Sequence, residues 1–171
     1  AFFEEFQMHS LTARFADKEE AAPEPTLEER ATDYRVAATP ADVAAFAATV
    51  NPEGLAVVAD IQPADARNGS LVGLALASGK GRALYVPLDA SVAGELEMGE
   101  GLPVASLQPV WDACGRRVVG HQVKATLKAL AAAGVGGLTP VFDTAVAAYD
   151  VDPTRSDYIL ADMARTILGA R

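Results

Sequence analysis

Cysteine and histidine are scarce in this chain of 171 residues. Cys114 is the single cysteine, and the two histidines are His9 and His121. One cysteine excludes an internal disulfide and a cysteine-rich zinc site. Two histidines far apart in the sequence give little support to a histidine-based metal site or a histidine-assisted nucleophile. This composition favours the reducing setting of the cytoplasm.

The chain also lacks long apolar runs and an excess of positive charge. Its apolar runs are far shorter than the roughly 20 residues that a membrane-spanning helix needs, and its opening does not resemble a signal peptide. The formal net charge is −9, whereas free-standing nucleic-acid binders are usually basic. A local basic cluster is either a solvated helix face, which the base rate for exposed charges favours, or a phosphate-binding patch: Arg116, Arg117, Lys124 and Lys128.

About half of the residues are apolar, so the chain can bury one substantial core. It opens with "AFFEEFQMHSLTARF", without an initiator Met, and we expect a piece of a longer protein. Five large apolar side chains in this stretch have roughly helical spacing: Phe2, Phe3, Phe6, Leu11 and Phe15. Such an aromatic face must dock on this domain or on a neighbour. Residues 16–33 are acidic and contain proline, as linkers do, so we predict an appendage over 1–33 and a folded domain over 34–171.

The order of predicted elements indicates an α/β fold. Thr39 and Pro40 are typical of a helix start and predict a helix from there to about residue 50. Strands are expected at 34–37, 55–59, 71–77 and 82–88, with a glycine-bearing hairpin turn between the last two. After an interrupted helix containing Pro109, we expect a strand at 116–120, a helix at 121–134, a short extended piece, and helices at 142–151 and 154–169. A three-strand antiparallel meander followed by alternating helices and strands predicts a ribonuclease-H-like mixed sheet with helices on both faces.

Three stretches carry a resemblance to a known family. They are "LAVVADIQPAD" with "LVGLALASGKGRALYVPL", "RRVVGHQVKATLKALAAAGV", and "VFDTAVAAYDVDPTRSDYILADMARTILG". In this order and spacing they resemble the middle, 3′–5′ exonuclease domain of bacterial family A DNA polymerase I, and "FFEEFQMHSLTARF" is similar to the end of the 5′ nuclease region. The resemblance implies a parent chain that acts in DNA replication and repair. Its partners would be the polymerase and 5′ nuclease domains of that chain, with DNA bound through the parent.

The same resemblance assigns the metal-binding positions. Family exonucleases use four carboxylates around two divalent metals. The first aspartate falls on Asp60, the glutamate two residues later on Gln62, and the aspartate of the second motif on Thr126. Magnesium prefers hard carboxylate oxygens, so we predict that the metal pair and the proofreading activity are lost, with Asp60 as a remnant. A rearranged site using Asp65, with Mg²⁺ or Mn²⁺, stays open as an alternative.

The third family motif, Tyr-x-x-x-Asp, is expected beyond Arg171. Tyr158 and Asp162 match its spacing, but they follow the Phe-Asp-Thr segment too soon, so we interpret them as a helix residue and its i+4 neighbour. Asp143 matches a family aspartate that is not a metal ligand.

Three functions are therefore compared. The first is a catalytically inactive, vestigial exonuclease domain with a structural role. The second is an active exonuclease with a rearranged carboxylate site. The third is a ribonuclease-H-like interaction module whose N-terminal aromatic helix binds a partner protein. In each case we expect a monomer without a membrane segment.

Overall fold

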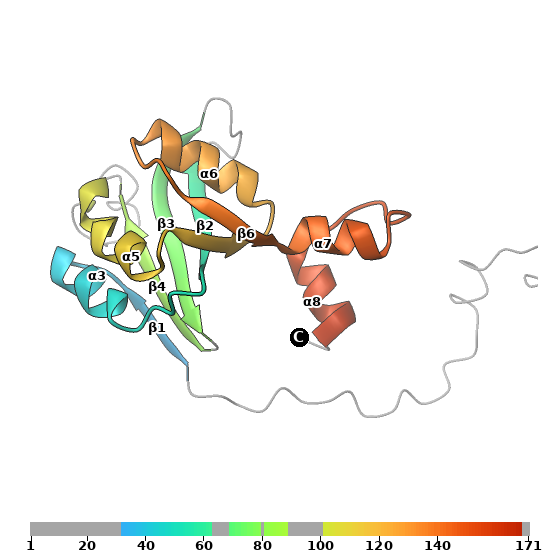
Figure 1. Ribbon diagram of the computed structural model, residues 1–171, viewed down its shortest axis with the longest axis horizontal. Helices are drawn as coiled ribbons and strands as arrows, with labels where there is room; N and C mark the ends of the chain where they lie inside the picture. The colour runs from blue at the N-terminus through green and yellow to red at the C-terminus, as the bar shows by residue number, and fades with distance from the viewer. Residues whose placement is uncertain (1–31, 63–68, 80, 89–100, 169–171) are drawn as a thin grey trace, which may run out of the picture.

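The computed structural model describes residues 32–62, 69–79, 81–88 and 101–168. Six strands form one mixed sheet in the order β1-β4-β3-β2-β5-β6 (Figure 1). The strands are β1 (Asp33–Val36), β2 (Leu55–Gln62), β3 (Ser70–Gly79), β4 (Arg82–Pro87), β5 (Arg117–Gly120) and β6 (Thr139–Asp143). The helices are α3 (Pro40–Ala47), the 3₁₀ turn η2 (Val104–Leu107), α5 (Gln108–Ala113), α6 (Val123–Ala132), α7 (Thr144–Val151) and α8 (Leu160–Leu168).

The pairing of the strands confirms the predicted ribonuclease-H-like α/β class. Strands β2, β3 and β4 form an antiparallel meander. Strand β5 then pairs parallel to β2, and β6 pairs parallel to β5. The chain passes through α5 before β5 and through α6 before β6, as parallel neighbours require. Strand β1 adds to the far edge, parallel to β4.

A single core lies between one face of the sheet and three helices. Alternate residues of the meander point into it, which is the period of a strand with one buried face. These residues are Leu55 and Val57 of β2, Leu74 and Leu76 of β3, and Leu84 and Val86 of β4. Helices α3, α5 and α6 supply the other half of the same core, with Val43, Phe46, Val110, Trp111, Val123 and Leu130.

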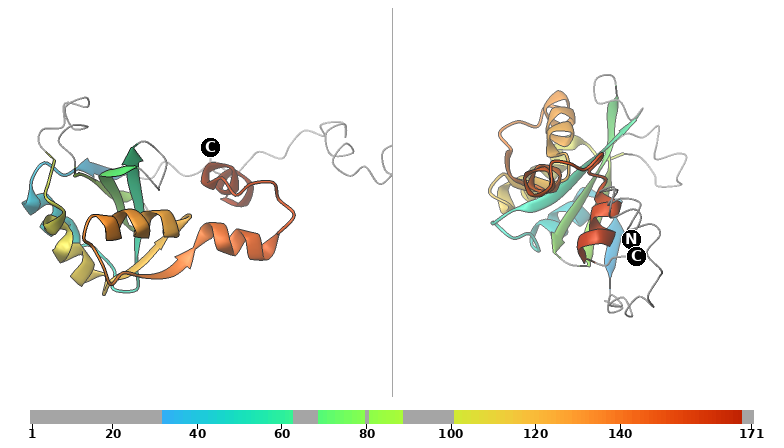
Figure 2. Two further views of the ribbon diagram at one scale, coloured as in Figure 1. Left: turned by 90° about the horizontal axis from the view of Figure 1, so that it is seen from above. Right: turned by 90° about the vertical axis from the view of Figure 1, so that its right-hand side faces the viewer.

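The expectation of helices on both faces of the sheet is not met within the described residues. Helices α3, α5 and α6 share one face, and α7 and α8 extend away from the end of β6 (Figures 1 and 2). The opposite face leaves the side chain of Val58, on the central strand β2, 51% exposed. In the described part of the chain no helix is both long and apolar enough to cross a membrane.

Local chemistry explains why the first helix begins where it does. Thr39 is the N-cap of α3, and its hydroxyl accepts a hydrogen bond from the Asp42 N–H. The Asp42 carboxylate accepts the Thr39 N–H in return at 2.8 Å, which completes a capping box. Pro40 occupies the first turn, where its lack of an N–H costs nothing. The predicted start of this helix is confirmed, although the helix ends earlier than expected.

The interruption expected near Pro109 is present: the 3₁₀ turn η2 precedes α5, and Pro109 lies in the first turn of α5. Two other expected boundaries are corrected. Helix α7 begins at Thr144, because Asp143 still belongs to β6 and caps the helix. Helix α8 begins at Leu160 rather than after Thr154. The Thr154 N–H and hydroxyl donate to the Asp152 carboxylate, so this segment forms a local Asx turn instead of a helix start.

Candidate functional site at the end of strand β2

Asp60 lies near the carboxyl end of β2, and its side chain contacts a tyrosine two strands away. The Tyr85 hydroxyl donates a hydrogen bond to Asp60 Oδ2 at 2.8 Å. Tyr85 belongs to β4, and β3 lies between the two residues. The phenol crosses β3 above Gly73, where an added Cβ would lie 2.0 Å from the Tyr85 hydroxyl oxygen. The absence of a side chain at Gly73 therefore allows this contact.

The ionisation of Tyr85 reflects this position. Burial, the hydrogen bond to Asp60 and the negative charge of Asp60 together raise the pKa of Tyr85 to about 12. The phenol thus stays protonated at neutral pH and acts as a donor to the carboxylate. Asp60 is engaged in a structural contact in the described part of the chain.

Thr126, which the resemblance aligns with the second-motif aspartate, is buried. It is 5% exposed, on the side of α6 that faces β2. Its Oγ1 accepts a hydrogen bond from the Ala59 N–H at 3.2 Å. Strand β5 pairs with β2 only at Leu55 and Ala56. Thr126 therefore supplies a hydrogen-bond acceptor to the β2 backbone beyond the end of that pairing. This hydroxyl satisfies a partly buried main-chain donor next to Asp60.

Gln62 is the last residue of β2 and is exposed. The structure thus brings the three motif positions to one end of β2 as one carboxylate, one amide and one hydroxyl. Within the described ranges there is no group of three or more His, Cys, Asp or Glu residues that could hold a metal ion. The residues present there do not fit a pair of divalent metals, which need several carboxylates. Asp65, the alternative ligand, lies outside the described residues.

A second aspartate at a strand end, Asp143, has a different role. Its carboxylate accepts backbone N–H groups from Gln122 at 3.0 Å, Val123 at 2.9 Å and Ala145 at 2.9 Å. Burial by itself would raise the pKa of Asp143, but the N–H donors of Val123, Ala145 and Gln122 outweigh it and hold that pKa below its usual value. Asp143 therefore joins the first turns of α6 and α7 as an anion between two helix N-termini.

The backbone of Gln122 is strained in this arrangement. Its φ of 51° and ψ of 44° are left-handed, which is uncommon for a residue with a side chain. The neighbouring residue His121 contacts Thr144 through Nδ1 and Oγ1 at 2.9 Å. The strand–turn–helix of the second motif is thus fastened to the start of α7 at two points.

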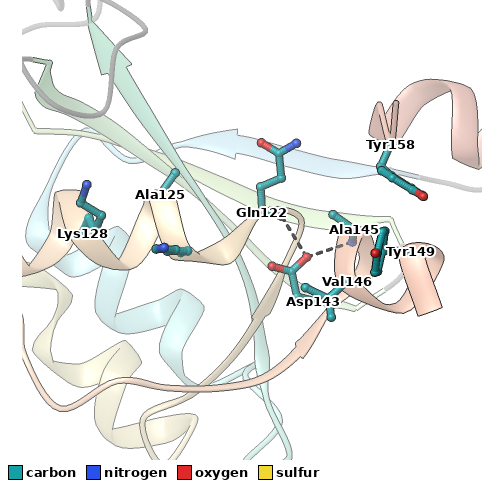
Figure 3. A pocket seen from close by; sticks show the side chains of 9 residues that line it. Gln122, Ala125, Lys128, Asp143, Ala145, Val146, Tyr149 and Tyr158 are labelled. Carbon is teal, nitrogen blue, oxygen red and sulfur yellow. Dashed lines mark hydrogen bonds between the residues drawn. The ribbon is translucent and has the colours of Figure 1, made fainter. Parts of the chain in front are cut away.

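A hollow of about 510 Å³ lies beside this junction (Figure 3). Lys124 and Lys128 of α6 line one side, and Tyr149 and Tyr158 line the other. The two tyrosine rings pack edge to face with centroids 6.0 Å apart. Two ammonium groups and an aromatic wall are suited to an anionic ligand with a planar group.

The predicted basic cluster divides into two parts. The Arg116 guanidinium donates to the Gly136 carbonyl at 2.7 Å, and Arg117 donates to the Glu53 carbonyl at 3.3 Å. These two arginines therefore hold loops. Only Lys124 and Lys128 of the cluster line the hollow, and both are exposed.

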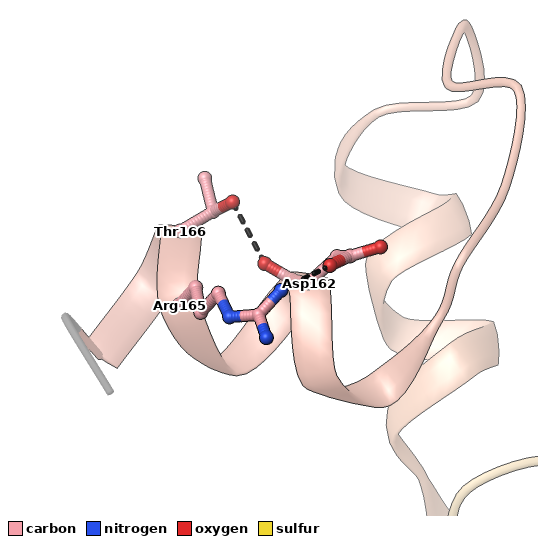
Figure 4. A network of polar contacts seen from close by, with 3 residues as sticks. All are labelled: Asp162, Arg165 and Thr166. Carbon is pink, nitrogen blue, oxygen red and sulfur yellow. Dashed lines mark hydrogen bonds and ion pairs between the residues drawn. The ribbon is translucent and has the colours of Figure 1, made fainter. Parts of the chain in front are cut away.

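Tyr158 and Asp162 do not join the motif positions. The Tyr158 hydroxyl donates to the Asp152 carbonyl at 2.7 Å, and Tyr158 precedes α8, so its interpretation as a helix residue is wrong. Asp162 pairs with Arg165 at 2.9 Å, and its carbonyl accepts the Thr166 hydroxyl at 2.8 Å (Figure 4). Both residues serve the local structure around α8.

Sequence reasoning did not identify the Tyr85–Gly73–Asp60 arrangement. The available signal was a glycine within an apolar strand, which marks the close approach of another group. Identifying that group required the strand register, because Tyr85 pairs with Ala75 and Asp60 pairs with Gly73.

No protein-family model and no curated protein sequence matches this chain. Solved structures are similar to it. The POL domain of Pol1 from M. smegmatis, in complex with DNA primer-template and dNTP, has a TM-score of 0.53 and 22% identity over 81% of this chain and 23% of that chain. Escherichia coli RNase D has a TM-score of 0.56 and 14% identity over 81% of this chain and 34% of that one. Brucella melitensis NrnC with bound Mg²⁺ has a TM-score of 0.53 and 14% identity over 82% and 63%.

These likenesses show the fold, which is the ribonuclease-H-like fold of 3′–5′ exonuclease domains. At such identities they do not assign an activity. The chain spans less than two thirds of the length of each of these three proteins.

Proposed function

We propose that this chain is the exonuclease-like domain of a family A DNA polymerase I, in which 3′–5′ cleavage is lost and the role is structural. The observation that carries the proposal is that the side chains at two of the three motif positions make structural hydrogen bonds. Asp60 accepts a hydrogen bond from Tyr85, and Thr126 accepts one from the main chain of β2. Both side chains stabilise the sheet at the place where an active enzyme would hold metal ions.

The chemistry of the donor set supports this reading. Replacement of two ligands by Gln62 and Thr126 removes about two negative charges from a site for two dications, and neutral oxygens do not compensate for that loss. The NrnC structure is described as holding Mg²⁺. This chain, in the part described, has no group of three or more His, Cys, Asp or Glu residues that could hold a metal ion.

The structural role follows from the parent that we propose. The domain would join the 5′ nuclease region to the polymerase, with residues 1–33 as the connection and 34–171 as the folded unit. The likeness to a polymerase structure supports this placement. We place the parent in the cytoplasm as a monomer that contacts DNA mainly through its other domains.

The hollow beside α6 favours a second candidate, the binding of a single strand without cleavage. Lys124 and Lys128 could contact phosphates, and the Tyr149 ring, which is 55% exposed, could stack on a base. The net charge of −9 opposes tight binding. We therefore expect weak, salt-sensitive contact.

The test is removal of the 3′ end of a mispaired primer by the purified chain, first in Mg²⁺ and then in Mn²⁺. We expect no cleavage above background in either metal, with Asp60→Ala indistinguishable from the unchanged chain. Cleavage that disappears in Asp60→Ala would overturn the proposal and would indicate a rebuilt site, with Asp65→Ala as the next variant.

A variant with restored ligands provides the matched positive control. Gln62→Glu combined with Thr126→Asp returns the two carboxylates to the motif positions. We expect this variant to gain Mn²⁺ binding in calorimetry, whereas the unchanged chain gives none. Equal Mn²⁺ binding by the unchanged chain and the variant would contradict the proposed loss.

A further inference from the structure

The face of the sheet opposite the core is apolar and open. Two rows of side chains cross it, defined by the strand register. One row is Val58, Ala75, Tyr85 and Val36, and the other is Val119, Ala56, Ala77, Ala83 and Tyr34. We call these nine residues the open face. It contains no charged residue.

Exposure of the open face is large for apolar residues in a sheet. Tyr34 is 68% exposed, Val58 is 51% exposed and Val36 is 49% exposed. Ala75 at its centre is exposed as well. A contiguous apolar surface of this kind marks a docking site.

The shape of the open face indicates the size of what it receives. Four alanines form a low floor, and the larger Tyr34, Tyr85 and Val58 stand around it. A floor of small residues packs well only against large side chains, because close packing alternates large and small groups. A second copy of the same face would bring alanines opposite alanines and leave voids.

The chain itself carries a matching segment. Residues 1–15 hold four phenylalanines and one leucine at helical spacing, with Glu and Gln between them. This segment connects to β1, the edge strand that contributes Tyr34 and Val36 to the open face, through residues 16–32. That linker can span up to about 55 Å when extended, and the tether keeps the segment at a high effective concentration.

We propose that the aromatic segment of residues 1–15 docks on the open face and supplies the second layer of the fold. The large phenylalanine rings fill the space above the alanine floor, and the polar residues of the segment face solvent. Tyr85 of the open face also donates a hydrogen bond to Asp60. The labelling test below measures coverage of Val58 and not metal binding, so this inference holds or fails independently of the proposed loss of exonuclease activity.

Thiol labelling of the full chain tests the docking. The native Cys114 is 0% exposed, and burial raises its pKa, so it provides a nearly silent background. A reporter thiol is placed on the open face by Val58→Cys, and a matched control thiol on the exposed surface of α6 by Ala131→Cys. We expect Val58→Cys to react at least tenfold more slowly than Ala131→Cys. Adding Phe3→Asp and Phe6→Asp should remove this protection and leave Ala131→Cys unchanged.

Each other outcome contradicts the proposal. Equal labelling of Val58→Cys with and without the two aspartates shows an open face that the segment does not cover. Protection that persists with the aspartates, together with a dimeric mass in light scattering, shows that a second copy of the chain covers the open face instead. Protection that persists with the aspartates in a monomeric chain shows that another part of the chain covers the open face.

A second measurement does not depend on the folding of the aspartate variants. A short bifunctional maleimide should join Phe6→Cys to Ala75→Cys in one chain and leave Phe6→Cys with Ala131→Cys largely unjoined. Equal joining of the two pairs overturns the proposal.

Discussion

Two aspartates at strand ends in this molecule have contrasting environments. Asp143 ends β6 and accepts three backbone N–H groups from two helix starts. Asp60 lies near the end of β2 and, among the described residues, accepts one hydroxyl group, from a tyrosine of β4. The Asp143 carboxylate accepts main-chain hydrogen bonds at the N-termini of two helices and stabilises both. Asp60 is partly exposed and, among the described residues, makes one side-chain hydrogen bond within the sheet. The comparison shows that a strand-end aspartate has no fixed role until the elements around it are known.

The largest expected effect in this comparison is the removal of the Asp143 carboxylate. Asp143→Ala leaves three N–H groups without their acceptor and should lower the free energy of unfolding by roughly 2–4 kcal/mol. Urea denaturation followed by circular dichroism measures the change. Asp60→Ala, as the matched variant, should cost less than half as much. Equal losses would remove the distinction between the two aspartates.

The pH dependence of stability tests whether the charge of Asp143 stabilises the fold. The pKa of Asp143 in the folded chain lies below the ordinary value of 3.8, so its ionised form stabilises the fold above that value. This stabilisation is lost as the pH falls through the folded pKa. The stability difference between the unchanged chain and Asp143→Asn should therefore shrink below pH 4. A difference that stays constant down to pH 2 would contradict the role of the charge.

Gly73 is predicted to tolerate a methyl group poorly. Gly73→Ala places a Cβ 2.0 Å from the Tyr85 hydroxyl oxygen, so the tyrosine must leave Asp60 at a cost of about 1–3 kcal/mol. The double variant with Tyr85→Ala should lose less than the sum of the two single losses, because the clash is then absent. Additive losses in thermal or urea denaturation would show that the ring does not occupy this space.

Thr126 is predicted to matter through its hydroxyl. Thr126→Val keeps the shape of the side chain but leaves the Ala59 N–H without its acceptor, at a cost of about 1–3 kcal/mol. Thr126→Ser retains the oxygen and is the control. Hydrogen exchange of the Ala59 amide should accelerate in the valine variant and not in the serine variant, and equal exchange in both would contradict the bond.

The smallest effect is expected at Asp60 itself. Asp60→Asn removes the negative charge that, with burial, raises the pKa of Tyr85 to about 12. The pKa of Tyr85 should fall but stay above its ordinary value of 10, because burial remains. A raised pKa favours the folded chain below pH 10, and this contribution is lost between pH 10 and pH 12. Absorbance of tyrosinate, compared with Tyr85→Phe to assign the signal, measures the shift, and an unchanged titration would contradict the contact.

Much of the fold was predictable because it depends on local signals. Thr39 and Pro40 predicted the start of α3, and short apolar runs such as residues 55–59, bounded by turn residues, predicted the strands of the meander. The errors occurred where a polar side chain forms hydrogen bonds other than those that its place in the sequence suggests. Thr154 looks like a helix cap but bonds to Asp152 in a turn, and Asp143 belongs to a strand while capping the next helix.

The candidate site was predictable in composition but not in geometry. The resemblance to exonuclease domains assigned Asp60, Gln62 and Thr126 to motif positions, and in the structure these residues lie near one end of β2. No sequence rule could supply the tyrosine that Asp60 contacts, because that contact depends on the register of three strands. The open face of the sheet was likewise not foreseen, because whether a face is covered depends on segments distant in the sequence.

The hydrogen bond between Thr126 and Ala59 also has an evolutionary consequence. If, as we propose, Thr126 replaced a metal-binding aspartate, a return to aspartate must place a charge in a buried position before any metal is present to balance it. A lineage would have to cross that less stable intermediate, or restore several ligands together. Natural drift from this sequence is therefore expected to retain a small polar residue at position 126 and to vary freely at the exposed position 62.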